Sequence, residues 1–208
     1  KSLAANGFSK YDITDVILTH LHFDHCGGSI DKVGDKLVPA FKNATYWSCE
    51  SHWNWAIHPN DREKASFLKE NILPIQESGQ LKFVNRNNII SETGLEHVAS
   101  EIDPAISFRF VNGHTDSMML PQIKIGNHTL VYMADLLPSV YHIPMAYVMG
   151  YDMFPMTTLN EKKSFLPEAL DNNYILFFEH DPVNECCILQ QTERGIRQKD
   201  CFKLSDII

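Results

Sequence analysis

Four side chains that can bind a metal ion fall within six consecutive residues near the start of the chain, namely His20, His22, Asp24 and His25. His20 and His22 lie two positions apart, so in an extended backbone their rings project to the same side and can bind one ion. Asp24 and His25 follow in the turn and can reach a second position. A histidine-rich surface turn is the alternative interpretation, but four such residues at this spacing favour a metal site.

The segment before this motif is expected to be a buried strand. Residues 15–20 are β-branched and apolar, which predicts a short strand that ends in a polar loop, and Gly27 and Gly28 then allow tight backbone geometry. Further strands are expected at 44–47, 81–84, 106–111, 174–178 and 187–191, and a hairpin within 118–134. Helices are expected at 51–57, 61–71 and 160–172, with Pro74 stopping the second and Asn160 capping the third. This mixture predicts one α/β or α+β domain over residues 1–208.

The motif and three later sites resemble the metallo-β-lactamase superfamily. The third histidine of that family follows a strand in a Gly-His-Thr context, and here it is His114. An aspartate that bridges two ions is expected at the end of a later strand, where Asp135 stands, and a last histidine after another strand, where His180 stands. The resemblance runs from about residue 13 to His180 and implies an αββα sandwich fold.

This resemblance also implies a dinuclear metal centre. One ion would be held by His20, His22 and His114, the other by Asp24, His25 and His180, and both by Asp135. Imidazole and carboxylate ligands suit Zn²⁺ and also accept Fe or Mn, so two divalent ions, with zinc favoured, are expected. A hydroxide between the ions would attack a carbonyl or phosphoryl group, since zinc lowers the pKa of bound water to about 7. Asp24 is expected to be catalytic as well, passing a proton to the leaving alkoxide.

Among the relatives, the branch of N-acyl-homoserine lactonases and organophosphate hydrolases is the one that this chain resembles most. A quorum-quenching lactonase that opens a small-molecule lactone or ester is therefore the expected activity. A phosphotriesterase or another esterase with the same centre is the alternative, and a non-hydrolytic diiron redox protein is a further one. Two departures bear on this choice. The Gly-His-Thr turn lacks the Pro-Gly-His continuation typical of glyoxalase II, and Pro138 stands where some lactonases carry a tyrosine that contacts the substrate.

Composition narrows the class of protein. The chain has 208 residues with 44% hydrophobic and 21% charged residues, as in ordinary globular domains, and a formal charge of −8. This charge argues against nucleic acid as a partner, and no apolar run is long enough to predict a membrane span. The five cysteines do not form the pattern of a disulfide framework, so a reducing, cytoplasmic location is expected. A homodimer is common among the relatives.

Two further segments are candidates for the substrate site. The aromatic segment 46–55 is either a lid over the metal centre or a helix packed on the sheet by its tryptophans. The loop 136–155 follows Asp135 directly and is the expected specificity loop, in which His142 can donate a proton or orient the substrate. Thr19, Asp116 and Glu179 are expected to contact the metal-binding side chains as hydrogen-bond partners.

Only about a dozen residues precede the first predicted strand, so the natural chain is expected to have additional N-terminal strands.

Overall fold

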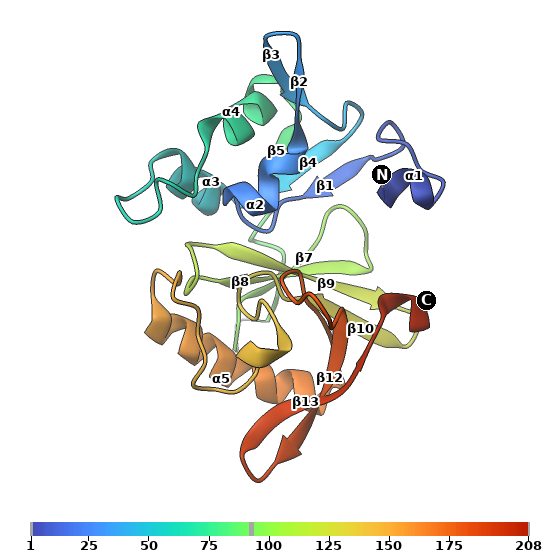
Figure 1. The fold of residues 1–208 in the computed structure, drawn as a ribbon, viewed down its shortest axis with the longest axis vertical. Helices are drawn as coiled ribbons and strands as arrows, with labels where there is room; N and C mark the ends of the chain where they lie inside the picture. Colours follow the sequence, from blue (N-terminus) through green and yellow to red (C-terminus); the bar gives the residue numbers. More distant parts are fainter. Residues whose placement is uncertain (1, 92–93, 208) are drawn as a thin grey trace. The chain divides into compact units, whose positions relative to one another are not determined.

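The structure is a computed structural model that describes residues 2–91 and 94–207. The chain divides into two compact units, unit 1 (Lys1–Val84) and unit 2 (Asn85–Ile208). Each unit contains strands and helices in mixed order (Figure 1). Each also has a hydrophobic core of its own, so its elements can be explained separately.

Unit 1 is built on a three-stranded parallel sheet with the order β1-β4-β5. These strands are β1 (Asp15–Ile17), β4 (Thr45–Ser48) and β5 (Leu81–Phe83). Parallel neighbours need crossover connections. The first connection contains α2 (Phe23–Cys26), a 3-10 turn η1 (Gly27–Ser29) and the hairpin of β2 (Ile30–Val33) and β3 (Lys36–Pro39). The second contains α3 (Glu50–Ile57) and α4 (Lys69–Glu77), and α1 (Ser2–Ala5) precedes the sheet.

The aromatic segment 46–55 contributes to the core of unit 1. Tyr46 on β4 and Trp53 on α3 are almost fully buried, and they belong to one cluster with Leu21, Ile72 and Ile75. The structure therefore shows the packing role that was one of the two interpretations of this segment. Burial of aromatic rings of this size stabilises a small sheet that has only three strands.

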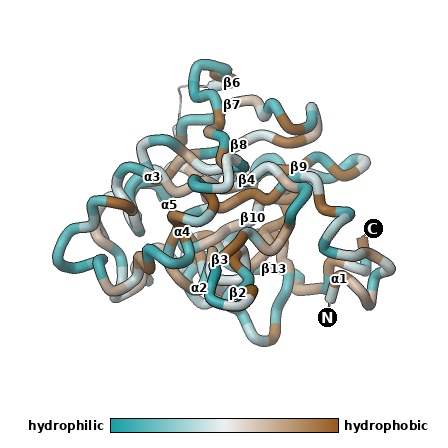
Figure 2. Tube along the Cα trace, turned by 90° about the horizontal axis from the view of Figure 1, so that it is seen from above, coloured by the Kyte–Doolittle hydropathy of each residue, from teal (hydrophilic) through white to brown (hydrophobic). Residues whose placement is uncertain are grey.

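The prediction of a helix at 61–71 is wrong. Residues 61–66 form turns, and α4 begins at Lys69 and continues through Pro74 to Glu77. The side chain of Asn60 accepts hydrogen bonds from the backbone N–H groups of Arg62 and Glu63, which offers the backbone an alternative to a helix. Pro74 does not stop α4 because it is buried together with Ile72 and Ile75, and this packing offsets the lost hydrogen bond. Figure 2 shows the turn region before α4 as a mainly hydrophilic stretch.

Unit 2 contains an eight-stranded sheet with the order β13-β12-β11-β10-β9-β8-β7-β6. Its strands are β6 (Ile89–Ser91), β7 (His97–Ala99), β8 (Ile106–Val111), β9 (Met118–Ile125), β10 (His128–Tyr132), β11 (Ile175–Phe177), β12 (Cys186–Thr192) and β13 (Gly195–Phe202). Neighbours are antiparallel except β10 and β11, whose connection contains the 3-10 turn η2 (Val140–His142) and α5 (Pro155–Asp171). A last 3-10 turn, η3 (Leu204–Asp206), follows β13. The predicted hairpin is confirmed, with Gly126 at a φ of 57° in its turn.

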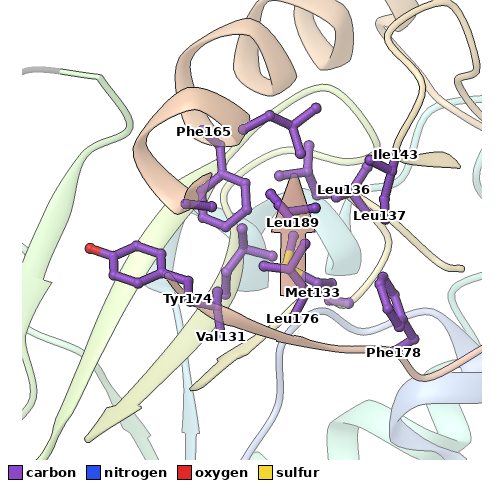
Figure 3. Close-up of a cluster of buried hydrophobic side chains, with 14 of the residues drawn as sticks. Val131, Met133, Leu136, Leu137, Ile143, Phe165, Tyr174, Leu176, Phe178 and Leu189 are labelled. Carbon is purple, nitrogen blue, oxygen red and sulfur yellow. The ribbon is translucent and has the colours of Figure 1, made fainter. Parts of the chain in front are cut away.

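Helix α5 packs on this sheet through one apolar face. Phe165, Leu166 and Ala169 are fully buried in a cluster with Val131 and Leu176 from the strands. Figure 3 shows the ring of Phe165 directed from the helix toward Leu189 and Val131. Asn160 does not cap this helix, because α5 begins at Pro155, whose missing N–H costs nothing in the first turn.

A buried arginine fixes the far end of α5 to the sheet. Arg109 on β8 is only 3% exposed, and its guanidinium donates to both carboxylate oxygens of Glu168 at 3.0 and 2.5 Å. Gln122 on β9 accepts a further hydrogen bond from Nε at 2.8 Å. A buried cation of this kind depends on its partner, because the guanidinium has lost its hydration.

Within residues 2–91 and 94–207, no helix is both long and apolar enough to cross a membrane. All five cysteines are free thiols in the structure, and only Cys201 is exposed.

Replacing Glu168 by Gln should lower the free energy of unfolding by about 2 kcal/mol, because the amide keeps the shape but leaves the buried guanidinium without a countercharge. The measurement is urea unfolding followed by far-ultraviolet circular dichroism. Lys199→Gln removes an exposed charge 3.7 Å from Asp200 and should change stability by less than about 0.5 kcal/mol. Equal stability of the Glu168→Gln variant and wild type would contradict the role given to this ion pair.

Candidate metal centre

Three histidine rings from the first motif lie together in unit 1. The ring centroids of His20 and His22 are 4.7 Å apart, and those of His20 and His25 are 3.9 Å apart. His20 and His22 follow β1 directly, and His22 occupies the N-cap of the short α2, which carries Asp24 and His25. The side chains of His20 and His25 are buried or nearly so, whereas that of Asp24 is 44% exposed.

The loop between His20 and His22 is fixed by a fourth histidine. The backbone N–H of Leu21 donates to Nε2 of His52 at 2.8 Å, and His52 on α3 is 1% exposed. His52 thus acts as an acceptor that holds the backbone between the two candidate ligands. Thr19, an expected partner, lies 3.3 Å from Nδ1 of His20 through its hydroxyl.

Glu63 is a contact of His22 that the sequence analysis missed. Its Oε1 lies 3.4 Å from Nε2 of His22, and the residue is 4% exposed. The other carboxylate oxygen accepts hydrogen bonds from Trp55 Nε1 at 2.7 Å and from Asn60 Nδ2 at 2.6 Å. The aromatic segment therefore also supports a candidate ligand, His22, through the hydrogen bond of Trp55 to Glu63.

In unit 2, the carboxylate of Asp135 lies between two histidines. Its Oδ2 is 3.0 Å from Nε2 of His114, and its Oδ1 is 3.4 Å from Nε2 of His180. Asp135 is buried at 6% exposure, and the side chain of His180 is 38% exposed. One carboxylate that offers a different oxygen to each of two imidazoles has the arrangement expected of a ligand shared by two ions.

The loop that carries His114 is held by α5. Glu161 accepts hydrogen bonds from the backbone N–H groups of Asn112 at 2.5 Å and Gly113 at 3.2 Å. A side chain at position 113 would place its Cβ 2.2 Å from the hydroxyl of Thr158, also on α5, so only glycine fits this approach. The Gly of the Gly-His-Thr turn thus allows the loop to contact the helix.

The backbone before Asp135 is strained. Ala134 has a φ of 41°, a left-handed conformation that residues with a Cβ rarely adopt, and it is fully buried. Met133 N–H donates to the carbonyl of Phe177 at 2.9 Å, and Leu136 N–H to the carbonyl of Met133 at 3.1 Å. Such strain persists only where surrounding contacts impose it, and it often accompanies functional sites.

Asp152 orients the ring of His114. Its Oδ1 lies 3.1 Å from Nδ1 of His114, and the side chain is fully buried. The next residue, Met153, donates its N–H to the carbonyl of His114 at 3.1 Å, which brings the two segments side by side. An Nδ1–H that donates to Asp152 leaves the lone pair of Nε2 directed toward Asp135, a common arrangement for metal-bound histidines. Asp152 lies in the predicted specificity loop, and nothing in its local sequence identified it.

The residues in each unit fit divalent ions. Burial alone would lower the pKa of His114, but hydrogen bonds to Asp135 and Asp152 raise it to about 9. The space between His114 and Asp135 is thus suited to a positive charge, which a divalent ion would supply in place of the proton. In unit 1, three imidazoles this close would repel one another if protonated, whereas their neutral forms are metal ligands.

Of the other candidates, His142 lies at the end of η2, where its Nδ1 is 2.9 Å from the hydroxyl of Ser139. His97 lies in the sheet, where its Nε2 is 2.8 Å from the hydroxyl of Ser107, and His58 caps a carbonyl of α3. These contacts give His97 and His58 structural partners. Burial raises the pKa of Tyr132 most, and a hydrogen bond to Glu179 raises it further.

A family model described as the metallo-beta-lactamase superfamily matches residues 1–180. A probable metal-dependent hydrolase from Staphylococcus aureus is 26% identical with a TM-score of 0.79, over 96% of this chain and 65% of that protein. The chain therefore spans slightly less than two thirds of that hydrolase. A search of curated proteins finds no match.

Two further solved structures share the fold at lower identity. AidC, a dizinc quorum-quenching lactonase in complex with a product, is 24% identical with a TM-score of 0.76, over 97% of this chain and 69% of that one. The hydrolase AbOPH is 21% identical with a TM-score of 0.72, over 97% and 69%. These comparisons confirm the family and the α+β fold class predicted from the sequence.

Replacing Asp152 by Asn should weaken zinc binding about 10- to 100-fold, because the neutral amide no longer enhances the basicity of His114 or fixes its tautomer. Isothermal titration of the chelator-treated full chain with zinc measures this change. Asp171→Asn, which removes an exposed charge at the end of α5, is the matched control and should bind zinc as wild type does. Unchanged zinc affinity in the Asp152→Asn variant would show that Asp152 does not support a ligand.

Proposed function

Because the chain belongs to the metallo-beta-lactamase superfamily, we propose that it is a metal-dependent hydrolase that opens a lactone or ester of a small molecule. The observation that carries this proposal is the Asp135 carboxylate, which offers one oxygen to His114 and the other to His180. The likeness in fold to AidC, a quorum-quenching lactonase solved with an N-acyl-L-homoserine product, supports N-acyl-homoserine lactones as the substrate class.

The family assignment supports the centre of two divalent ions that the sequence predicts. In it His20, His22 and His114 would bind one ion, Asp24, His25 and His180 the other, and Asp135 both. Zinc fits this donor set, and the dizinc lactonase supports it. When bound, such ions polarise a carbonyl oxygen and lower the pKa of a water molecule toward neutrality.

The residues around the ligands perform positioning roles in this reaction. Asp152 and Glu161 hold the ring and the backbone of His114, and His52 holds the backbone between His20 and His22. Fixed ligands of this kind need no reorganisation during the reaction, which favours catalysis. Asp24 would accept the proton that the attacking hydroxide brings to the adduct and pass it to the leaving alkoxide, so the carboxylate is regenerated; its 44% exposure leaves it accessible for this transfer.

Apolar side chains on the loop after Asp135 support a substrate with an acyl chain. Tyr151 and Phe154 on this loop are 83% and 45% exposed, and Met156 in the first turn of α5 is 68% exposed. Phe154 N–H donates to the carbonyl of Gly113 at 2.8 Å, so this apolar segment is fixed next to the His114 loop. Burial of such side chains by an acyl chain would contribute to binding.

The first test is ring opening of N-decanoyl-L-homoserine lactone near neutral pH, followed by mass spectrometry as the gain of one water. Zinc-loaded full chain should open the lactone, a chelator should stop the reaction, and added zinc should restore it. A sample without protein measures spontaneous opening. Zinc-loaded protein that leaves the lactone closed would overturn the lactonase proposal, and cleavage of a phosphotriester by the same sample would assign the centre to that chemistry instead.

Replacing Asp24 by Asn should lower turnover of the lactone by about 100-fold or more, since general acid catalysis contributes about that factor. Metal analysis of the same sample should show that the ion held by His20, His22 and His114 is retained. Asp35→Asn, in an exposed turn between β2 and β3, is the control and should retain full turnover. Unchanged turnover in the Asp24→Asn variant would exclude the proton-transfer role.

A further inference from the structure

Unit 2 contains a pocket that the proposed reaction does not use. Its volume is about 530 Å³, and it lies between the loop that includes η2 and the edge strand β13. One wall, called the loop wall, is formed by side chains of residues 140–148, and the opposite wall is formed by Arg197 and Gln198 of β13. None of the candidate metal ligands of unit 2 lines it, although its loop wall belongs to the predicted specificity loop and includes His142.

The walls of the pocket are largely apolar and aromatic. Val140, Pro144 and Val148 supply aliphatic surface, and Tyr141 and Tyr147 supply two rings. These rings are 73% and 61% exposed, so they are not committed to the core. A flat ligand that covered them would bury apolar area and stack on an aromatic face.

One side of the pocket carries a cation without a countercharge. Arg197 donates from Nη1 to the carbonyl of Ile196 at 2.6 Å. Across the part of the chain that the structure describes, no carboxylate pairs with this guanidinium, and no acidic residue lines the pocket. A guanidinium has five N–H donors in a planar fork that matches a carboxylate, so Arg197 retains donors for a ligand.

A second cation lies behind the loop wall. The ammonium of Lys162 on α5 donates to the carbonyls of Pro144 at 3.0 Å, Met145 at 3.3 Å and Tyr147 at 2.6 Å, and this lysine is fully buried. Its charge is felt at His142, which lines the pocket. Burial is the largest cause that lowers the pKa of His142, and the charge of Lys162 lowers it further, whereas Asp152 and Asp135 act in the opposite direction. The loop wall is thus held on a buried positive charge.

The loop is also fixed at its start, so the pocket is preformed. Val140 N–H donates to Oδ2 of Asp181 at 3.1 Å, and the hydroxyl of Ser139 contacts His142 at 2.9 Å. A pocket that exists before binding needs little ordering of side chains, which favours affinity for a small ligand.

We propose that this pocket binds a small monocarboxylate with an aromatic body, its carboxylate on Arg197 and its ring against Tyr141 and Tyr147. The guanidinium selects the charge, and the apolar walls select the body of the ligand. This inference goes beyond the hydrolase activity and does not depend on it, since none of the pocket residues is a proposed metal ligand.

The test uses 3-phenylpropionate and its uncharged analogue 3-phenylpropanamide, titrated into the chelator-treated full chain and followed by ligand-observed NMR. Chelator treatment prevents the carboxylate from binding to a metal ion instead. Wild type should bind the carboxylate about tenfold or more tightly than the amide, the effect typical of a charge-assisted hydrogen bond. Arg197→Gln should remove this preference, and Arg197→Lys should keep part of it.

The matched control is Arg194→Gln, which removes the same charge from the exposed turn of the same hairpin, outside the pocket lining. It should bind 3-phenylpropionate as wild type does. The proposal is overturned if wild type does not bind 3-phenylpropionate, if it binds the amide equally well, or if Arg197→Gln and Arg194→Gln have the same effect.

Discussion

The contact between Asp135 and two histidines sets the requirements that the rest of unit 2 meets. A carboxylate with 6% exposure must have compensating partners, and here Oδ2 and Oδ1 lie 3.0 and 3.4 Å from the imidazoles of His114 and His180. The three residues come from three separate loops, so each loop has to be held firmly in place. The strained Ala134 before Asp135 and the glycine before His114 are consequences of this requirement.

Helix α5 supplies most of the holding contacts. Thr158 and Glu161 meet the His114 loop, Lys162 binds three carbonyls of the loop after Asp135, and Glu168 neutralises Arg109 on the sheet. The apolar face of the same helix is buried at Phe165. Polar residues inside a helix usually face solvent, but here they are directed to loops whose backbone groups need partners.

The sequence predicted those parts of the site that are local. His20, His22, Asp24 and His25 are recognisable because their spacing alone places them together, and His114, Asp135 and His180 follow from the resemblance to the family. Asp152 and Glu63 were not predicted, because each reaches its histidine through tertiary contacts that no short spacing encodes. The prediction of a helix at 61–71 was wrong because the hydrogen bonds from the backbone N–H groups of Arg62 and Glu63 to the side chain of Asn60 outweighed helix propensity. No residue range was predicted for β13, so the pocket beside Arg197 could not be anticipated.

Glu161 and Lys162 are adjacent on one rigid helix, and one holds the His114 loop while the other holds the wall of the Arg197 pocket. A displacement of α5 by one residue, about 1.5 Å along its axis, would alter both loops at once. A ligand that shifted α5 at one of these places would therefore also move the loop at the other. Such an influence is reciprocal by thermodynamic necessity: a molecule in the pocket that changes the affinity of His114 for an ion has its own affinity changed by the same factor.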